Sequence, residues 1–301
     1  MANKNAAARI EQVSSQLVTP NYTSATVPGK LASKVAIITG CNSNIGIGHA
    51  TALEFARQGA KAIYVTDFAT ENLQALADKI VATYPDVKAH ARRVDAAEES
   101  QVSGIVDEAL AAYGRLDIFF ANAGISGPKH MITDTAPADY MQTMKVNSLG
   151  PFLGVKHGSR GMKVTSPEKP ESRGAIILTA SVAGIRSGAG GVAYSASKAS
   201  VINLAQTCAY QLTRTNIRVN ALCPGLTETG MTAPTFDAAR ARGTDKKIGQ
   251  LNPLGRYALA SEMATVVAFI ASDEASYFNG QPIAVDGGLS ASHPVVPGRF
   301  S

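Results

Sequence analysis

The sequence predicts an α/β fold: a single doubly wound domain whose mostly parallel sheet carries helices on both faces. Two observations predict it. Runs of β-branched and other apolar residues recur along the chain, at 35–39, 62–66, 116–120, 175–179 and 217–222. Between them, apolar residues repeat at spacings of three and four, which is the pattern of amphipathic helices. This alternation implies a parallel sheet covered by helices, with ligands bound beyond the carboxyl ends of the strands.

The first elements show the pattern most clearly. Residues 35–39 read Val-Ala-Ile-Ile-Thr, as expected of a strand buried on both faces, and 62–66 read Ala-Ile-Tyr-Val-Thr. The apolar stripe of the helix that follows consists of Leu73, Leu76, Ile80, Val81 and Tyr84. The stripe of the next helix consists of Val102, Ile105, Val106, Ala109, Leu110 and Tyr113. Right-handed crossovers between parallel strands then favour the doubly wound arrangement.

Composition and residue spacing exclude several classes of protein. Of the 301 residues, 45% are hydrophobic and 17% are charged, which is enough for one substantial core. The net charge of +5 is scattered without interleaved aromatic residues, so we expect no nucleic-acid partner. No stretch reaches the roughly 18 to 20 apolar residues of a membrane helix, so we expect no membrane partner. The unclustered cysteines favour a cytoplasmic location, and the histidine spacing predicts no metal site.

We expect one folded domain with an extension at each end. Residues 1–33 are predicted to form an N-terminal arm, and 291–301 an extended C-terminal tail. Within the domain, 34–290, a polar surface loop is expected at 162–173 and an irregular connection at 227–254. Connections as long as the second are often lids over a site.

A glycine-rich segment follows the first strand. Residues 40–48 read Gly-Cys-Asn-Ser-Asn-Ile-Gly-Ile-Gly, and a helical pattern starts directly after them. Glycines let the backbone approach a pyrophosphate closely, and the start of the helix offers unpaired N–H groups to the anion. An ordinary tight turn is the alternative, but the position between strand and helix favours phosphate binding. The candidate contacts are Gly40, Asn42, Ser43, Gly46, Ile47 and Gly48.

Asp67 ends the second strand, nineteen residues after Gly48. A carboxylate at this place can accept hydrogen bonds from the ribose hydroxyls of adenosine, with Phe68 beside it as a further cofactor contact. A 2′-phosphate would meet the like charge of Asp67, and the flanking Ile45 and Phe68 offer no cation. We therefore expect NAD in preference to NADP. A helix N-cap without a ligand is the alternative role for Asp67.

Tyr194 and Lys198 lie one helical turn apart, so a phenol and an ammonium share one helix face. A nearby cation favours the phenolate, which would bring the pKa of Tyr194 toward the range in which it carries protons. Such a pair alone could be a surface pair. Ser181, however, follows a buried strand and precedes Tyr194 by thirteen residues, through the mostly small residues 183–191. Small residues leave room for a substrate.

At this point the chain resembles the short-chain dehydrogenase/reductase family, whose members carry a serine and, about thirteen residues later, Tyr-x-x-x-Lys. The resemblance covers roughly 34–288. It implies a Rossmann-type domain with a seven-stranded sheet and the activity of an NAD(P)-dependent alcohol dehydrogenase or carbonyl reductase. The further matches are Asp95 with Ala96, Asn122-Ala123-Gly124, Asn147, Pro224-Gly225 with Thr227 and Thr229, and 285–288.

The resemblance also implies roles for these residues. The catalytic tetrad would be Asn147, Ser181, Tyr194 and Lys198. Asp95 looks like the residue that contacts adenine, and 122–124 like the element that supports the sheet behind the cofactor. The segment 224–229 is similar to the one that holds the nicotinamide carboxamide.

The glycine-rich segment departs from the family's pattern. The family has three residues between its Thr-Gly and Gly-Ile-Gly elements, whereas five residues separate Gly40 from Gly46. An ungapped alignment would put Asn44 in place of the middle glycine, but the following helix would then fall out of register. We therefore infer a two-residue insertion, which leaves the phosphate contacts of Asn42 and Ser43 open. The lengthened loop resembles a fungal subgroup of the family.

The expected reaction is reversible hydride transfer between NAD(H) and a secondary alcohol or ketone. Ser181 would bind the substrate oxygen, Tyr194 would exchange the hydroxyl proton, and Lys198 would lower the pKa of Tyr194 and bind the nicotinamide ribose. Asn147 would hold a water that links Lys198 to solvent. The family also implies a homotetramer or homodimer assembled through the helix of Tyr194 and the edge near the last strand. Packing in the monomer core explains the apolar stripe at 201–212 of that helix nearly as well.

Three other functions compete with this one. An NADPH-dependent ketoreductase of a biosynthetic pathway would keep the fold, and Asp67 argues against it. A non-catalytic dinucleotide sensor would be credible if Tyr194 or Lys198 were missing, but both are present. A serine hydrolase using Ser181 or Ser187 lacks both the Gly-x-Ser-x-Gly element and a histidine partner.

Overall fold

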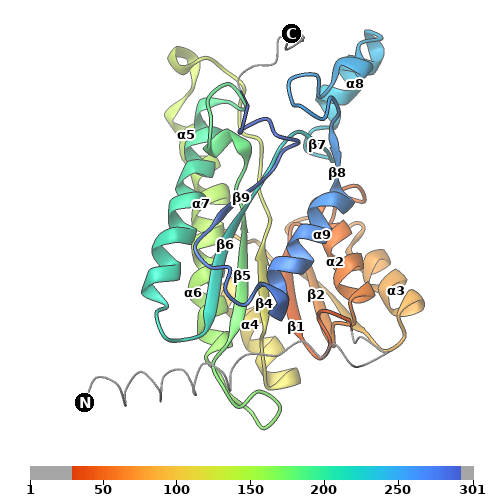
Figure 1. Ribbon diagram of the computed structural model, residues 1–301, viewed down its shortest axis with the longest axis vertical. Coiled ribbons are helices and arrows are strands. Elements are labelled where there is room, and N and C mark those ends of the chain that lie inside the picture. Colours follow the sequence, from red (N-terminus) through yellow and green to blue (C-terminus); the bar gives the residue numbers. More distant parts are fainter. Residues whose placement is uncertain (1–28, 293–301) are drawn as a thin grey trace, which may run out of the picture.

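The computed structural model describes residues 29–292 and contains a seven-stranded sheet (Figure 1). The strand order is β3-β2-β1-β4-β5-β6-β9, and every neighbouring pair is parallel. The strands are β1 Val35–Thr39, β2 Ala62–Asp67, β3 Lys88–Arg93, β4 Ile118–Ala121, β5 Gly174–Thr179, β6 Ile217–Pro224 and β9 Pro282–Val285. The predicted α/β class is confirmed, and this sheet is parallel throughout where the sequence predicted a mostly parallel one.

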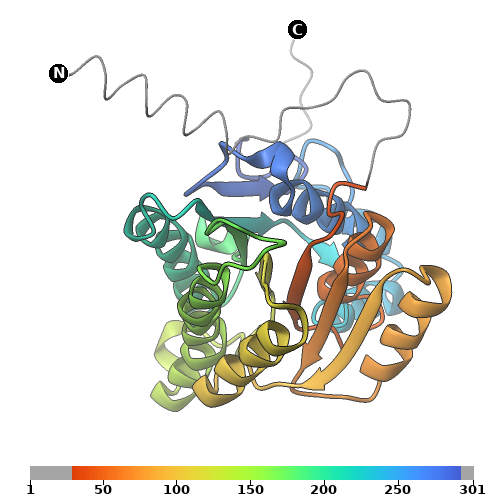
Figure 2. The same ribbon diagram turned by 90° about the horizontal axis from the view of Figure 1, so that it is seen from below.

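Helices cover both faces of the sheet (Figure 2). One face carries α2 Ile47–Arg57, α3 Leu73–Thr83 and α9 Ala260–Ala271, and the other carries α4 Glu99–Tyr113, α6 Gly150–Met162 and α7 Val192–Gln211. Alternation along each strand divides the core between the two layers. Ala36 and Ile38 pack toward α2, α3 and α9, while Val35 and Ile37 pack toward α4, α6 and α7.

The predicted strands miss β3, which reads Lys-Ala-His-Ala-Arg-Arg and lies at the edge of the sheet. Half of its residues are exposed and the others are only partly buried, so it lacks the apolar run on which the other assignments rest. The third predicted strand begins two residues too early. Leu116 and Asp117 precede β4 and are buried there.

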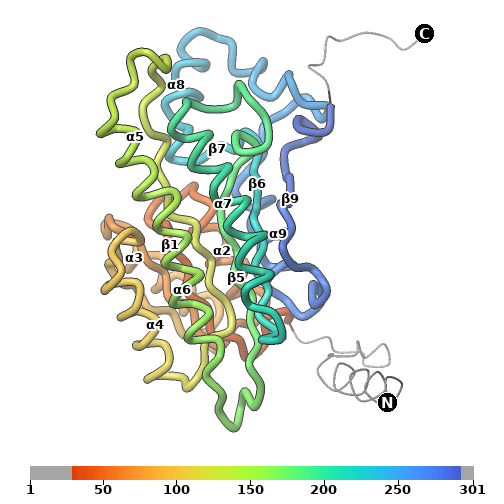
Figure 3. Tube along the Cα trace, turned by 90° about the vertical axis from the view of Figure 1, so that its left-hand side faces the viewer, coloured from red at the N-terminus to blue at the C-terminus, as the bar shows by residue number. Residues whose placement is uncertain are grey.

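The loops at the carboxyl edge of the sheet carry further elements. The short helix α5 Pro137–Met144 continues through a π-helical turn, η2 Lys145–Leu149, into α6. The helix α8 Ala233–Ala241 lies at the same end of the molecule as α5 (Figure 3). Two short strands, β7 Thr227–Glu228 and β8 Ala258–Leu259, pair with each other. The 3₁₀ turns are η1 Ile132–Asp134, η3 Val182–Gly184, η4 Asp245–Lys247 and η5 Asp273–Ala275.

The predicted lid, 227–254, is more ordered than its sequence suggested, because it contains α8. Phe236 on this helix is 1% exposed and packs edge-to-face on Tyr257, with ring centroids 4.9 Å apart. A single buried aromatic anchors the helix, and one such residue is too little to produce a visible apolar period.

The ends of the chain fall largely outside the described residues. Of the predicted arm at 1–33, only 29–33 are described, and Leu31 among them is buried in the core. Of the tail at 291–301, only the first two residues are described. Within 29–292, none of the helices combines the length and the apolar character needed to cross a bilayer.

The apolar stripe of α7 belongs to the monomer core. Val201 and Ala205 are fully buried and Cys208 nearly so, all within the layer between the sheet and α4, α6 and α7. Core packing, the second of the two explanations of this stripe, therefore holds for these residues, while Leu204 and Leu212 of the same stripe are only partly buried.

Candidate active site

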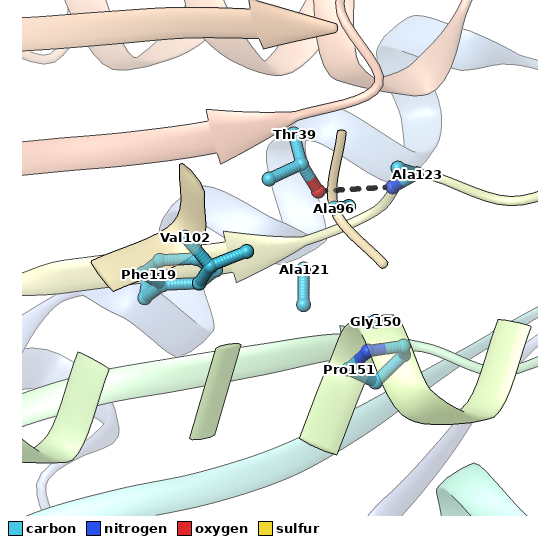
Figure 4. Close-up of a pocket in the computed structure, with 8 residues that line it drawn as sticks. All are labelled: Thr39, Ala96, Val102, Phe119, Ala121, Ala123, Gly150 and Pro151. Carbon is cyan, nitrogen blue, oxygen red and sulfur yellow. Dashed lines mark hydrogen bonds between the residues drawn. The ribbon is translucent and has the colours of Figure 1, made fainter. Parts of the chain in front are cut away.

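The candidate site lies where β1 and β4 end side by side, the point at which the strand order reverses. The Thr39 hydroxyl accepts the N–H groups of Asn122 and Ala123, both at 3.0 Å. Figure 4 shows the bond to Ala123. The Asn122 amide donates to the carbonyl oxygens of Thr39 at 3.1 Å and Gly40 at 3.2 Å. Its own oxygen accepts the hydroxyl of Thr179. Asn122 thus joins the ends of β1, β4 and β5, as the sequence led us to expect of a sheet-supporting residue.

The glycine-rich segment turns tightly into α2. Gly40 has φ +77°, and a Cβ on Gly48 would lie 2.3 Å from the Gly40 carbonyl oxygen, so both positions require glycine. The helix begins at Ile47 with Gly46 as its N-cap, and no side chain caps it. Its first N–H groups therefore remain available at the end of the segment. A helix start at Gly46-Ile47-Gly48 agrees with the two-residue insertion and not with the ungapped alignment.

Asn42, in the lengthened loop, is committed to protein contacts. Its backbone N–H donates to Asp67 at 2.9 Å and its amide donates to Glu71 at 2.7 Å. Its side-chain and backbone oxygens accept from the backbone and the side chain of Asn72. The Asn42 side chain therefore ties the loop to the β2–α3 connection rather than pointing at a phosphate. Ser43 lies beside Gly230 of the lid. A Cβ on Gly230 would be 2.6 Å from the Ser43 hydroxyl oxygen.

Asp67 lies at the carboxyl end of β2, as expected. One of its carboxylate oxygens accepts the N–H of Asn42 and the other accepts the N–H of Ala69 at 3.2 Å. Phe68, beside it, is 60% exposed. The expectation that no cation is near is wrong, because Arg93 pairs with Asp67 in the β2–β3 register and its guanidinium carbon lies 4.7 Å from the Phe68 ring centroid. The position of Arg93 beside Asp67 could not be predicted from the sequence, because β3 was not recognised as a strand.

Asp95 and Ala96 lie in the turn between β3 and α4. The Asp95 carboxylate accepts the N–H of Ala97, and its own N–H donates to the side chain of Gln101. Ala96 is buried and lines a small apolar recess together with Thr39, Val102, Phe119, Ala121, Ala123, Gly150 and Pro151 (Figure 4). This recess lies behind the ends of β1 and β4.

Ser181, Tyr194 and Lys198 come together at the other end of the site. Ser181 directly precedes η3, and its hydroxyl accepts the N–H of Ala183 at 3.1 Å. The side chain of Ser181 also lies near the phenol of Tyr194 and affects its pKa. The ammonium of Lys198 donates to the Thr179 carbonyl at 2.7 Å and lies 5.6 Å from the centroid of the Tyr194 ring.

Burial governs the titration of both catalytic candidates. It raises the pKa of Tyr194, and the nearby Ser181 side chain acts on this pKa in the opposite direction more weakly. Burial lowers the pKa of Lys198 to about 8. We expected Lys198 to bring the pKa of Tyr194 down, and the structure does not show this. The physical reason is that the phenol is desolvated while the ammonium is directed at the Thr179 carbonyl.

Asn147 occupies the π-helical turn η2 and is fully buried. Its oxygen accepts the N–H of Ile125 at 2.8 Å, and its amide donates to the Ile125 carbonyl at 2.9 Å and to Ser197 at 3.1 Å. A Cβ on Gly124 would lie 3.1 Å from the Asn147 oxygen and 3.5 Å from the Lys198 ammonium, so these three residues converge. Sequence reasoning missed Ser197, although its place between Tyr194 and Lys198 was visible.

The segment after β6 closes the site from the side of the lid. A Cβ on Gly225 would lie 2.7 Å from the Asp286 Cα, so Pro224-Gly225 passes close to the end of β9. The Thr227 hydroxyl donates to the Gly225 carbonyl at 3.2 Å. The Thr232 hydroxyl donates to the Thr227 carbonyl and accepts the N–H of Thr229. The threonines predicted to contact the cofactor are thus held by local hydrogen bonds.

Two connections meet at the mouth of the site. The carbonyl of Pro128, in the loop after β4, would lie 2.7 Å from a Cβ on Gly191, just before α7. Lys129 donates to the Thr235 hydroxyl on α8 at 3.4 Å. Met131 and Ile132 on the same loop are 72% and 69% exposed. Residues 29–292 bring together no group of three His, Cys, Asp or Glu side chains that could hold a metal ion.

Comparisons with known proteins agree with this geometry. A family model described as enoyl-(acyl carrier protein) reductase matches residues 40–290. Levodione reductase from Leifsonia aquatica is 34% identical over 88% of this chain and 97% of its own length. Momilactone A synthase from Oryza sativa subsp. japonica is 38% identical over 87% and 91%.

Solved structures give the same result. The crystal structure of levodione reductase superimposes with a TM-score of 0.79, covering 87% of this chain and 100% of that one, at 34% identity. A short-chain type dehydrogenase/reductase from Mycobacterium marinum superimposes with a TM-score of 0.76 over 87% and 97%, at 31% identity.

Proposed function

The chain belongs to the short-chain dehydrogenase/reductase family and is an NAD(P)-dependent alcohol dehydrogenase or carbonyl reductase, and we propose that it uses NAD(H) with a tetrad of Asn147, Ser181, Tyr194 and Lys198. The observation that carries the proposal is the convergence of these four side chains at the carboxyl edge of the sheet. The side chain of Ser181 lies near the Tyr194 phenol, and the Lys198 ammonium lies beside the Tyr194 ring.

The tetrad supplies the proton chemistry. A nicotinamide cofactor bound here supplies or accepts the hydride. Ser181 donates a hydrogen bond to the substrate oxygen and so places it against the phenol of Tyr194. Tyr194 gives its proton to that oxygen during ketone reduction and takes it back during alcohol oxidation. Because the serine side chain lies near the phenol, one substrate oxygen can hydrogen-bond to both.

Lys198 and Asn147 lead from Tyr194 toward the interior. The Lys198 ammonium has three donors, and the Thr179 carbonyl uses one of them. Gly124 has no side chain, so space remains between the Asn147 oxygen and the Lys198 ammonium. A water held there would pass protons to and from Lys198, and the remaining ammonium donors would bind a ribose hydroxyl. Asn147 itself is fixed by Ile125 and Ser197, which keeps its oxygen directed at this space.

The other half of the site fits a dinucleotide. The free N–H groups at the start of α2 lie at the end of the glycine-rich turn, where a pyrophosphate would bind. Gly40 and Gly48 let this turn pack tightly against itself and against Asn122. The carboxylate of Asp67 can accept further hydrogen bonds from ribose hydroxyls, since each oxygen accepts one backbone N–H and retains a second acceptor position. This favours NAD(H) over NADP(H).

We propose an apolar secondary alcohol or ketone as the substrate. Met131 and Ile132 after β4 and Met231 in the lid expose large apolar surfaces at the end of the molecule that carries the tetrad, while Lys129 and Arg186 are occupied by hydrogen bonds. The similar proteins act on compounds named as levodione, a 3β-hydroxysteroid and carveol, which agrees with this class. A cytoplasmic location and a homo-oligomeric state are part of the same proposal.

An NADPH-dependent ketoreductase is the second candidate, because Arg93 lies next to Asp67. Absorbance at 340 nm separates the two. The purified protein would be assayed with NAD and NADP against apolar secondary alcohols and polyols, and with NADH and NADPH against the matching ketones. We expect turnover of apolar alcohols with NAD(H). A preference for NADP(H) would overturn the cofactor assignment alone, while absence of turnover by a protein that binds NAD in calorimetry would favour a non-catalytic sensor.

A further inference from the structure

Arg93 and Asp67 lie side by side on neighbouring strands. β2 and β3 pair in parallel, and these two residues are register partners at the carboxyl end of each strand. Register partners in a parallel pair point to the same face of the sheet, about 5 Å apart at the backbone. A positive and a negative side chain therefore emerge together at the place where the adenosine ribose would bind.

The two arginines that end β3 have different surroundings. Arg92 points to the opposite face and makes a bidentate ion pair with Glu108, donating from Nη2 to Oε1 at 2.7 Å and from Nε to Oε2 at 3.1 Å. Arg93 makes no ion pair within residues 29–292, and its guanidinium lies over the exposed ring of Phe68. Stacking on an aromatic face leaves the N–H groups at the rim of the guanidinium free to donate. Arg93 is thus a fixed cation with spare donors.

The rest of the nucleotide end of the site has no comparable cation. The lengthened loop offers Asn42, Ser43 and Asn44, which are neutral, and Asn42 is already bonded to Asp67, Glu71 and Asn72. A phosphate on the ribose 2′-oxygen would need a positive partner, and a planar guanidinium suits it best. The carboxylate of Asp67, which such a phosphate would approach, opposes it, and the Glu71 carboxylate on the far side of Asn42 adds a second negative charge nearby.

We propose that Arg93, held on Phe68, is a latent subsite for a 2′-phosphate on adenosine, and that the charge of Asp67 keeps this subsite from being used. The proposal rests on the proposed NAD(H) function. The preference between NAD(H) and NADP(H) would then depend on both Asp67 and Arg93. Removing the negative charge of Asp67 should allow Arg93 to bind the 2′-phosphate.

Direct binding of nucleotide fragments tests the proposal without catalysis. Calorimetry would compare adenosine 2′,5′-bisphosphate with ADP on four proteins: the wild type, Asp67→Asn, Asp67→Asn/Arg93→Gln and Asp67→Asn/Arg92→Gln. Asn at position 67 keeps an acceptor for one of the two backbone N–H groups. The Arg92→Gln variant is a matched control, since it removes the same charge from the same strand on the other face. Thermal melts confirm that each variant is folded.

We expect Asp67→Asn to bind adenosine 2′,5′-bisphosphate at least about tenfold more tightly than the wild type, since one charge repulsion is removed. Adding Arg93→Gln should lose about tenfold of this gain, and adding Arg92→Gln should lose less than about threefold. The affinity for ADP should change little across the series. An Arg93→Lys exchange should recover part of the loss, because it restores the charge without the fork.

Two failures are distinguishable. If Arg93→Gln weakens the bisphosphate no more than Arg92→Gln does, the 2′-phosphate subsite is wrong, while NAD binding and turnover by the wild type still support the proposed function. If the wild type binds neither ADP nor NAD and shows no turnover with any nicotinamide cofactor, the proposed function fails, and the subsite falls with it.

Discussion

Lys198 and Lys169 are both buried lysines whose pKa is lowered by burial to about 8, but they differ in what surrounds the ammonium. Lys198 is at the carboxyl edge of the sheet and Lys169 at the amino edge, in the connection before β5. Lys169 donates to three carbonyl groups, those of Leu116, Met162 and Val164. Lys198 donates to the Thr179 carbonyl alone among the described protein groups.

The comparison shows that a lowered pKa does not distinguish the proposed catalytic lysine from the other buried lysine, whereas the number of unused hydrogen-bond donors does. An ammonium has three donors, and all three donors of Lys169 are hydrogen-bonded to backbone carbonyls. These bonds hold the segment 162–173 against the core. Near it, Arg115 and Asp117 form a buried bidentate pair in which Asp117 also accepts the N–H of Val35. The buried polar groups named at the amino edge are therefore hydrogen-bonded to one another. At the carboxyl edge, Lys198 keeps donors that can hydrogen-bond to a ligand.

Among substitutions at the carboxyl edge, Tyr194→Phe should reduce the catalytic rate most. Removing the hydroxyl takes away the proton carrier, so kcat should fall by roughly 10² to 10⁴. Calorimetric affinity for NAD should stay nearly unchanged, because the ring and Lys198 remain. Steady-state kinetics in both directions would measure the loss, and a Tyr194→Phe enzyme with normal kcat would remove Tyr194 from the mechanism.

The pH dependence of the rate should show the raised pKa of Tyr194. Alcohol oxidation needs the phenolate, so its kcat/KM should increase by up to about tenfold per pH unit from pH 7 to 9. Ketone reduction needs the protonated phenol and should hold its rate over the same interval. Initial rates at 340 nm across this range are the measurement. An oxidation rate that is already constant below pH 7 would mean that the Lys198 ammonium outweighs burial.

Lys169→Met should act on stability instead of rate. Methionine keeps the stem but leaves the three buried carbonyls without their donor, so the free energy of unfolding should fall by about 1 to 3 kcal/mol. Urea unfolding would measure it. The effect should grow between pH 8 and 10.5, because there the folded wild type has released the Lys169 proton and the unfolded chain still binds it. An unchanged unfolding midpoint would show that the three hydrogen bonds contribute nothing net.

Glu168→Gln should have the smallest effect. The side chain of Glu168 pairs with Lys61 at 2.8 Å, but 64% of it is exposed to solvent. Exposed pairs of this kind contribute about 0 to 1 kcal/mol, so the unfolding midpoint should hardly move. A destabilisation as large as that of Lys169→Met would contradict the account, because the exposed Glu168 would then contribute as much to stability as the buried Lys169.

Much of the site could be predicted because its residues are local in sequence. Short stretches of sequence are enough to place them. The four-residue spacing puts Tyr194 and Lys198 on one helix face, the glycines at 40–48 indicate a tight turn, and Asp67 directly follows a buried strand. The fold was predictable for a similar reason, since buried parallel strands are continuous apolar runs.

What could not be predicted depends on partners distant in sequence. β3 has a polar edge-strand sequence, and without it Arg93 could not be placed beside Asp67. Asn42 was a candidate phosphate contact, and only the structure shows it bonded to the β2–α3 connection. Lys169 lies in a polar stretch predicted to be a surface loop, and its burial follows from three carbonyls that no local pattern reveals.

The most direct test is kcat for Lys198→Met beside kcat for Lys169→Met, each measured with saturating cofactor at a temperature where both variants are folded. The account predicts that Lys198→Met loses at least about tenfold in kcat with little loss of stability, and that Lys169→Met keeps the wild-type kcat while unfolding more easily. Equal kcat values for the two variants would contradict it, because the buried lysine at the carboxyl edge would then do no more than the one at the amino edge.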